Sequence, residues 1–292
     1  MSRGTPATAG PTGTTRRPRT SVRAPTRLPK GNTAVRVITW NANRTNRWDL
    51  LWADPLVAGL AWDVICLQEV GNPDVAHWTH AQGPVWSQDR AARDTDESFV
   101  QRRYTYQPAH YPAALHITHT EWGNRQKNHL TIITQTRPTW AAEIGGDMSD
   151  RPVLGIKVRL TLPTGPTDVL LGCVHLVANR TKSPQELGAL VPYLNDMCRE
   201  ANAQGWLLAG DFNCSPTEMV QSAGSAVGVW YPSFPTQDSI GEPIDYVVVE
   251  PHLYQAVMAM PGISGNWERG TAASDHRLVR YTQPNGPALQ VL

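Results

Sequence analysis

Short apolar runs dominate the hydrophobic pattern of the chain, and few stretches have the spacing of an amphipathic helix. Runs rich in β-branched residues predict strands at 35–40, 63–69, 129–134, 151–160, 168–176, 205–212 and 243–250. Many strands and few helices predict an α+β protein. The expected architecture is a four-layer sandwich, in which two mostly antiparallel β-sheets pack face to face with helices on the outside.

Apolar residues at helical spacing predict two helices, one within 47–60 and a longer one at 183–204. The longer helix opens on a capping signal, because Ser183 is a suitable N-cap residue and Glu186 stands three positions later. Gly205 is placed to end this helix.

Residues 34–284 are predicted to form one folded domain, between a tail at 1–33 and a short C-terminal tail at 285–292. The first tail is rich in Thr, Pro and Arg and holds almost no bulky apolar residue, so we expect it to be disordered. Residues 71–110 are polar and are predicted to be loop-rich. A loop of that length is typical of a functional or mobile segment.

Charge is divided unevenly along the chain. The 292 residues include 26 basic and 25 acidic groups, for a net charge of +1. Seven basic groups and no acidic one fall within 1–30, which leaves 19 basic groups against 25 acidic ones in the remainder. The balance near zero argues against a simple basic nucleic-acid binder. The basic tail is either a solvated linker or an electrostatic arm for nucleic acid.

Neither a transmembrane segment nor a secretory signal is recognisable, because no apolar run approaches the roughly 20 residues that span a bilayer. We therefore expect a soluble protein, cytoplasmic by default. The four cysteines lack the spacing of a zinc site, and we expect them to be reduced and, where they lie in strands, buried.

Polar residues stand directly after, or at the start of, several predicted strands. Because strands end at the rim of a sheet, we expect these side chains to converge on a common site. They are Asn41, Glu69, His175, Asp211, Asn213, Asp245, Asp275 and His276.

The chemistry of this set favours a divalent cation. Glu69, Asp211 and Asp275 offer hard oxygen donors without cysteine, which suits Mg²⁺ or Mn²⁺ rather than zinc. Asn41 and Asn213 add neutral amide groups that can position a ligand or a metal-bound water.

Proton transfer is the second capability of the set. His175 and His276 can carry protons near neutral pH, and Asp245 can fix the tautomer of His276. A divalent ion, two histidines and fixed amides can together direct activated water at a phosphoester.

The ordered motifs TWN, QE, VH, GDFN, IDY and SDH resemble the endonuclease/exonuclease/phosphatase superfamily over roughly residues 35–281. The superfamily includes deoxyribonucleases, abasic-site endonucleases, inositol-polyphosphate phosphatases and sphingomyelinases. The segments 123–134, 150–157 and 173–180 look most like the catalytic subunit of cytolethal distending toxins. The departures from that subunit include Cys214 in place of a basic residue, VHLVANR in place of a Gly-rich loop, Asn43 at a position beside the metal that varies across the superfamily, and the lack of a recognisable secretory signal.

The resemblance implies a role for each site residue. Glu69, with Asp275 and Asn41, is expected to bind the metal. The catalytic group is expected to be His175, Asp211, Asn213, Asp245, His276 and Asn41. Substrate phosphates are expected to be held by Arg125 and Arg151, since guanidinium groups suit that task.

A Mg²⁺- or Mn²⁺-dependent phosphodiesterase that nicks DNA is the function that these features predict, with DNA as the partner. A phosphatase of phosphoinositide headgroups or other phosphomonoesters is the alternative, since the same centre can serve both. A non-catalytic binding domain is a third hypothesis. A toxin-like effector would be exported and would need delivery subunits that this chain does not encode.

Overall fold

The computed structural model describes the protein in segments, all within the unit Asn32–Leu292. Arg125 lies outside the described residues. Those residues are 35–43, 48–53, 57, 62–71, 82–91, 98–106, 114–122, 129–144, 151, 153–162, 165–223, 227–232, 234–237, 239–253, 264–268 and 274–282.

Two β-sheets make up the centre of the fold. The first has eight strands, β1 (Val37–Asn41), β2 (Val64–Gln68), β3 (Gln82–Ala91), β4 (Ser98–Tyr106), β5 (Leu115–Trp122), β6 (Leu130–Thr134), β13 (Ser264–Glu268) and β14 (Leu278–Thr282). Their order is β13-β14-β1-β2-β6-β5-β4-β3. The second sheet has six strands, β7 (Trp140–Ile144), β8 (Val153–Leu162), β9 (Gly165–His175), β10 (Trp206–Asp211), β11 (Gly228–Trp230) and β12 (Asp245–Val249). Their order is β11-β12-β10-β9-β8-β7.

Each sheet contains one parallel pair among its described strands, β1 with β2 and β9 with β10. The other described pairs are antiparallel, including β1 with β14 and β10 with β12. A parallel pair ends at one edge of its sheet, and an antiparallel neighbour begins at that same edge. Side chains that end β1, β2, β9 and β10 are therefore brought beside those that begin β12 and β14.

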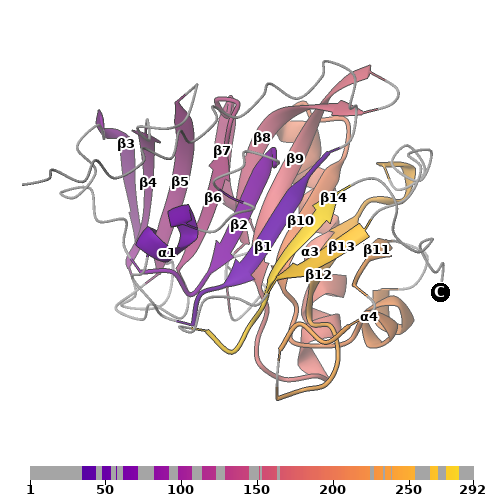
Figure 1. Ribbon diagram of the computed structural model, residues 1–292. Helices are drawn as coiled ribbons and strands as arrows, with labels where there is room; N and C mark the ends of the chain where they lie inside the picture. The colour runs from indigo at the N-terminus through magenta and orange to yellow at the C-terminus, as the bar shows by residue number, and fades with distance from the viewer. Residues whose placement is uncertain are drawn as a thin grey trace, which may run out of the picture. The chain divides into compact units, whose positions relative to one another are not determined.

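Alternation along the strands separates two apolar cores. In β1, Val37 belongs to the core between the sheets, whereas Ile38 belongs to the core on the outer face of the eight-stranded sheet. Helix α1 (Trp48–Ala53) packs on that outer face, and α3 (Lys182–Glu200) packs on the six-stranded sheet (Figure 1). Helix α4 (Pro216–Ala223) packs against α3. The predicted sandwich of two mostly antiparallel sheets with helices outside is confirmed.

Within its described residues, the expectation of a loop-rich stretch at 71–110 was wrong, because β3 and β4 lie within it. Residues 72–81, 92–97 and 107–110 lie outside the described residues. β3 ends the eight-stranded sheet and pairs with β4. The register of that pair shifts between Gln82 and Trp86, around Pro84. Proline has no N–H to donate and is tolerated in edge strands and at bulges, so Pro84 argues against a strand in the sequence although the segment forms an edge strand.

The predicted start and end of the long helix also need correction. Helix α3 begins at Lys182, and the Ser183 hydroxyl donates to the carbonyls of Val177 and Asn179 instead of capping the helix. The first N–H groups are capped by Asn179, whose Oδ1 accepts from Thr181 and Lys182. The helix ends at Glu200, five residues before Gly205.

All four cysteines are free thiols with buried side chains, in agreement with the sequence prediction. In the described part of the chain, no helix combines the length and apolar character needed to cross a bilayer.

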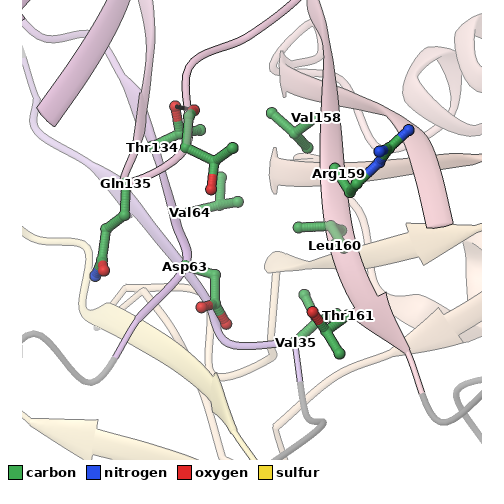
Figure 2. A pocket seen from close by; sticks show the side chains of 10 residues that line it. Val35, Asp63, Val64, Thr134, Gln135, Val158, Arg159, Leu160 and Thr161 are labelled. Atoms are coloured by element: carbon green, nitrogen blue, oxygen red, sulfur yellow. Dashed lines mark hydrogen bonds between the residues drawn. The ribbon is translucent and has the colours of Figure 1, made fainter. Parts of the chain in front are cut away.

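A small cavity of about 160 Å³ lies where β1 and β2 begin and β6 ends (Figure 2). Its charged lining groups are paired within the protein. Asp63 accepts from Arg36 at 2.9 Å, and Arg159 donates to Asp168 at 2.8 and 2.9 Å. The carboxyl ends of β1 and β2, at the opposite edge of the sheet, carry the polar residues considered next.

Candidate active site

One row of the six-stranded sheet carries three of the predicted residues. Asp211 ends β10 and is the register partner of both His175, which ends β9, and Asp245, which begins β12. All three side chains are buried, with Asp245 at 0% and Asp211 at 1% exposure. Three ionisable groups on adjacent strands therefore face the same space.

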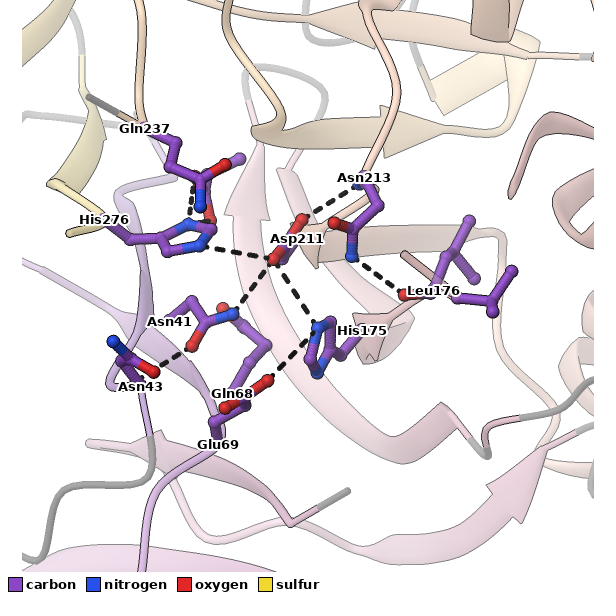
Figure 3. Close-up of polar contacts among 12 residues, drawn as sticks. Asn41, Asn43, Gln68, Glu69, His175, Leu176, Asp211, Asn213, Gln237 and His276 are labelled. Atoms are coloured by element: carbon purple, nitrogen blue, oxygen red, sulfur yellow. Dashed lines mark hydrogen bonds and ion pairs between the residues drawn. The ribbon is translucent and has the colours of Figure 1, made fainter. Parts of the chain in front are cut away.

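A hydrogen bond across the sandwich joins this row to the eight-stranded sheet. The Asn41 amide, at the end of β1, donates to Asp211 Oδ2 at 2.9 Å (Figure 3). The other oxygen, Oδ1, accepts from the backbone N–H of Asn213 at 2.9 Å. Both oxygens of the Asp211 carboxylate are thus held in place. The backbones also approach closely here, since a Cβ on Gly210 would lie 1.9 Å from the Val174 carbonyl oxygen.

His276 pairs with two carboxylates. Its Nδ1 lies 3.0 Å from Asp245 Oδ2, and its Nε2 lies 3.8 Å from Asp211 Oδ2. Burial by itself lowers the pKa of His276, but the charges of Asp245, Asp211 and Asp275 and the hydrogen bond to Asp245 outweigh it and raise this pKa to about 10. His276 is therefore an imidazolium at neutral pH, held by Asp245.

Burial shifts the pKa of Asp211 upward, whereas it shifts that of His276 downward, because in both cases it disfavours the charged form. Burial and the neighbouring Asp245 charge raise the pKa of Asp211 to about 7, although His276 and the bonds from Asn41 and Asn213 act in the other direction. The site thus contains two titratable groups of very different pKa side by side. Such pairs are typical of acid–base centres.

Glu69 and His175 form the second half of the site. His175 Nε2 lies 3.7 Å from Glu69 Oε1 and 3.6 Å from Asp211 Oδ2 (Figure 3). Glu69 directly follows β2, and its backbone N–H donates to the His129 carbonyl at 3.0 Å. Its φ is +51°, and Asn43 and Asn213 share this left-handed conformation, with φ of +47° and +52°. Three non-glycine residues around one site therefore adopt a left-handed backbone conformation, which is energetically unfavourable for residues other than glycine.

The donors present could hold a metal ion. Within the described residues, Asp211, Asp245 and His276 each place one potential donor atom within 4.8 Å of the others, but the protonated ring of His276 has no free lone pair for a metal. Glu69, Asn41 and Asp275 are the ligands predicted from sequence. Together these residues fit a hard divalent cation, because the buried carboxylates of Glu69, Asp211 and Asp245 and the exposed carboxylate of Asp275 outnumber the one imidazolium. The excess of negative charge needs a positive counterpart.

The remaining predicted residues lie beside this centre. Asn213 Nδ2 and Arg151 both donate to the Leu176 carbonyl, at 2.9 and 3.2 Å, directly after His175. Asp275 is exposed, and its Oδ1 accepts from the Asn43 amide at 3.2 Å.

Two supporting residues were not predicted from sequence, Thr236 and Gln237. The buried Thr236 hydroxyl accepts from the N–H groups of Ile244 and Asp245 at 2.9 and 3.0 Å, which fixes the start of β12. Gln237 pairs with His276 through an isolated antiparallel bridge. Both residues lie in a polar loop whose composition carries no motif, so only the three-dimensional structure reveals them.

Comparison with known proteins places this site in context. The pattern of the Endonuclease/Exonuclease/phosphatase family matches residues 38–276. No curated protein matches the sequence. Among solved structures, the fold is similar to that of the Haemophilus ducreyi cytolethal distending toxin, with 18% identity and a TM-score of 0.62 over 86% of this chain and 98% of that one.

A second toxin structure, from Actinobacillus actinomycetemcomitans, has 18% identity and a TM-score of 0.59 over 84% of this chain and 97% of that one. CdtB, the biologically active subunit of cytolethal distending toxin, has 18% identity and a TM-score of 0.59 over 86% of this chain and 98% of that one. At such identity the likeness concerns the fold, whereas the family follows from the sequence match. The match at residues 38–276 covers most of the chain and shows that the protein belongs to the Endonuclease/Exonuclease/phosphatase family.

Proposed function

We propose that the protein is a divalent-metal-dependent phosphodiesterase that nicks DNA. The observation that supports this most strongly is the convergence of Glu69, His175, Asp211, Asp245 and His276 on one edge of the sandwich, within 3.0 to 3.8 Å of their partners. Family membership supports hydrolysis of a phosphoester bond. DNA as the substrate rests on the resemblance of three segments to the toxin catalytic subunit.

Mg²⁺ or Mn²⁺ is the proposed cofactor, with Glu69, Asn41 and Asp275 as the residues that would hold it. When bound, the cation supplies positive charge that stabilises the phosphate oxygens and the leaving oxygen. Oxygen donors without cysteine favour these ions over zinc.

Asp211 is the residue that we assign as the base for the attacking water. Its pKa of about 7 lies near neutrality, where a base is both ionised and able to accept a proton. His276, with a pKa of about 10, already carries its proton and acts as a hydrogen-bond donor to the phosphate. Asp245 keeps this imidazolium charged and oriented through the 3.0 Å contact with Nδ1.

Hydrogen-bond donors on the Glu69 side of the site are proposed to stabilise the negative charge on the phosphate oxygens. His175 is positioned between Glu69 and Asp211, and its Nε2 can donate to a phosphate oxygen. Arg151, beside the Leu176 carbonyl, is proposed to bind a flanking phosphate. Arg125 is proposed for the same task on the basis of sequence alone.

Plasmid nicking tests this function. The wild-type protein should convert supercoiled plasmid to open circles with Mg²⁺ or Mn²⁺ and should lose that activity with EDTA. His175→Ala should be slower by at least about 100-fold, because one donor to the transition state is removed. His252→Ala is the matched control, since His252 is exposed and contacts the Gln204 carbonyl. Equal nicking by wild type and His175→Ala would refute the proposal.

Phosphomonoesterase activity is measured under identical conditions. Phosphate release from a panel of phosphoinositides, without plasmid nicking, would identify a lipid headgroup as the substrate and would refute the assignment of DNA. Absence of both activities, together with no thermal shift on adding metal, would support the non-catalytic alternative.

A further inference from the structure

Asp275 is an exposed carboxylate beside the site, yet both of its oxygens are held. Oδ1 accepts from Asn43 Nδ2 at 3.2 Å, and Oδ2 accepts from Gln237 Nε2 at 2.9 Å. The three residues are distant in sequence, so the contact depends on the folded arrangement of three loops.

The chemical type of these two donors is informative. Several other carboxylates near the surface pair with guanidinium groups, as Asp168 does with Arg159. Such a pair neutralises the carboxylate, whereas an amide orients it and leaves its full negative charge. Asp275 is therefore both oriented and charged, which is the state that a ligand for a cation requires.

Both donors are anchored to catalytic residues. The N–H of Asn43, whose φ is +47°, donates to Asn41 Oδ1 at 2.9 Å. Gln237 forms the backbone bridge to His276. On the other side of Asp275, the Ser274 hydroxyl donates to the Asn41 carbonyl at 2.7 Å. The carboxylate is thus fixed with respect to Asn41 and His276.

Gln237 donates to Asp275 while the oxygen of its own side-chain amide is left without a hydrogen bond among the described residues. This oxygen, Oε1 of Gln237, is buried. A buried carbonyl oxygen without a partner is unfavourable for folding. An arrangement that lowers stability locally but orients a charged group is more readily explained by function than by folding.

We propose that Gln237, assisted by Asn43, is a positioning residue that orients the Asp275 carboxylate for the divalent cation while leaving its charge intact. The proposal rests on the metal dependence proposed above. It does not depend on which phosphoester is cleaved.

Mn²⁺ titration calorimetry on the full chain measures the effect directly. Gln237→Met keeps the size of the side chain and removes the donor, so Mn²⁺ affinity should fall about 10-fold or more, as is usual when a partner of a metal ligand is lost. The Mn²⁺ concentration for half-maximal turnover should rise by the same factor, and kcat at saturating Mn²⁺ should stay within about twofold of wild type. Gln221→Met, on the exposed face of α4, is the matched control and should bind Mn²⁺ as wild type does.

Stability separates positioning from a structural role. Gln237→Met also removes the buried unpartnered oxygen, so its unfolding midpoint without metal should equal or exceed that of wild type. Gln237→Lys keeps a donor but neutralises Asp275, and should weaken Mn²⁺ binding at least as much as Gln237→Met. Wild-type Mn²⁺ affinity in either variant would overturn the proposal. Gln237-dependent Mn²⁺ binding in a protein that cleaves no phosphoester would instead refute only the proposed function.

Discussion

Removal of one buried charge should change the protonation of the whole site. Asp245→Asn keeps the shape of the side chain and removes its charge, 3.0 Å from His276 Nδ1. In the wild-type protein, the pKa of His276 is raised from its ordinary value of 6.5 to about 10. At about 1.4 kcal/mol for each pH unit, its surroundings favour the imidazolium by about 5 kcal/mol. Much of that preference comes from Asp245, so the pKa of His276 should fall by several pH units in the variant.

Heteronuclear NMR of the histidine rings, in protein treated with EDTA, measures this pKa. His276 should stay protonated through pH 8 in wild type and should lose its proton near neutral pH in Asp245→Asn, with His276→Gln used for assignment. The pKa of Asp211, which Asp245 raises, should fall in the same variant. Asp168→Asn, at an exposed pair with Arg159, is the control and should leave His276 unchanged.

The pairing of His276 with Asp245 makes the free energy of unfolding depend on pH. A histidine with a raised pKa in the folded state contributes its full stabilisation below pH 6.5, and this is lost as pH rises towards 10. The free energy of unfolding of the metal-free wild type should therefore decline between pH 7 and pH 10, and the decline should be smaller in Asp245→Asn. A His276 that titrates near pH 6.5 in the wild-type protein would refute the reasoning.

Three further substitutions test other parts of the fold. Gly210→Ala places a Cβ 1.9 Å from the Val174 carbonyl oxygen and should cost about 3 kcal/mol in urea unfolding, and an unchanged midpoint would contradict that close approach. Burial lowers the pKa of His119 well below 6.5, so the unfolded chain alone takes up its proton and stability should drop by about 1.4 kcal/mol for each pH unit below 6.5. His119→Gln should flatten that drop in denaturation series from pH 7 to pH 5. Asn41→Ala frees one oxygen of Asp211, and kcat for nicking should fall about 100-fold, with KM little changed.

The central strands could be predicted from sequence because they are covered on both sides. β1 and β2 are buried at every position, so each is a mostly apolar run, interrupted only by Thr39 and Gln68, with a polar residue, Asn41 or Glu69, at its end. A polar residue at the end of such a strand is visible in the sequence. The contact between Asn41 and Asp211 cannot be seen in the sequence, because it depends on how the two sheets pack.

Local hydrogen bonding accounts for most of what sequence missed. The helix α4 opens on a capping box, in which Ser215 N–H donates to Glu218 at 2.7 Å, and the spacing of these two residues was a usable signal. The cap of α3 was assigned to Ser183, whereas the side chain that accepts is Asn179. Several polar residues near a helix start compete for the same N–H groups, and the path of the preceding loop decides between them.

The position of β1 between β2 and β14 has a consequence for synthesis of the protein. The first strand of the described chain is hydrogen-bonded to the last one, with Val37 opposite Tyr281. A ribosome that has released the chain as far as β12 has delivered Glu69, His175 and Asp211, but His276 has not yet emerged. The growing polypeptide therefore lacks the imidazolium until nearly all of the described chain has been made. The complete candidate site can therefore form only after β14 has been made and has paired with β1.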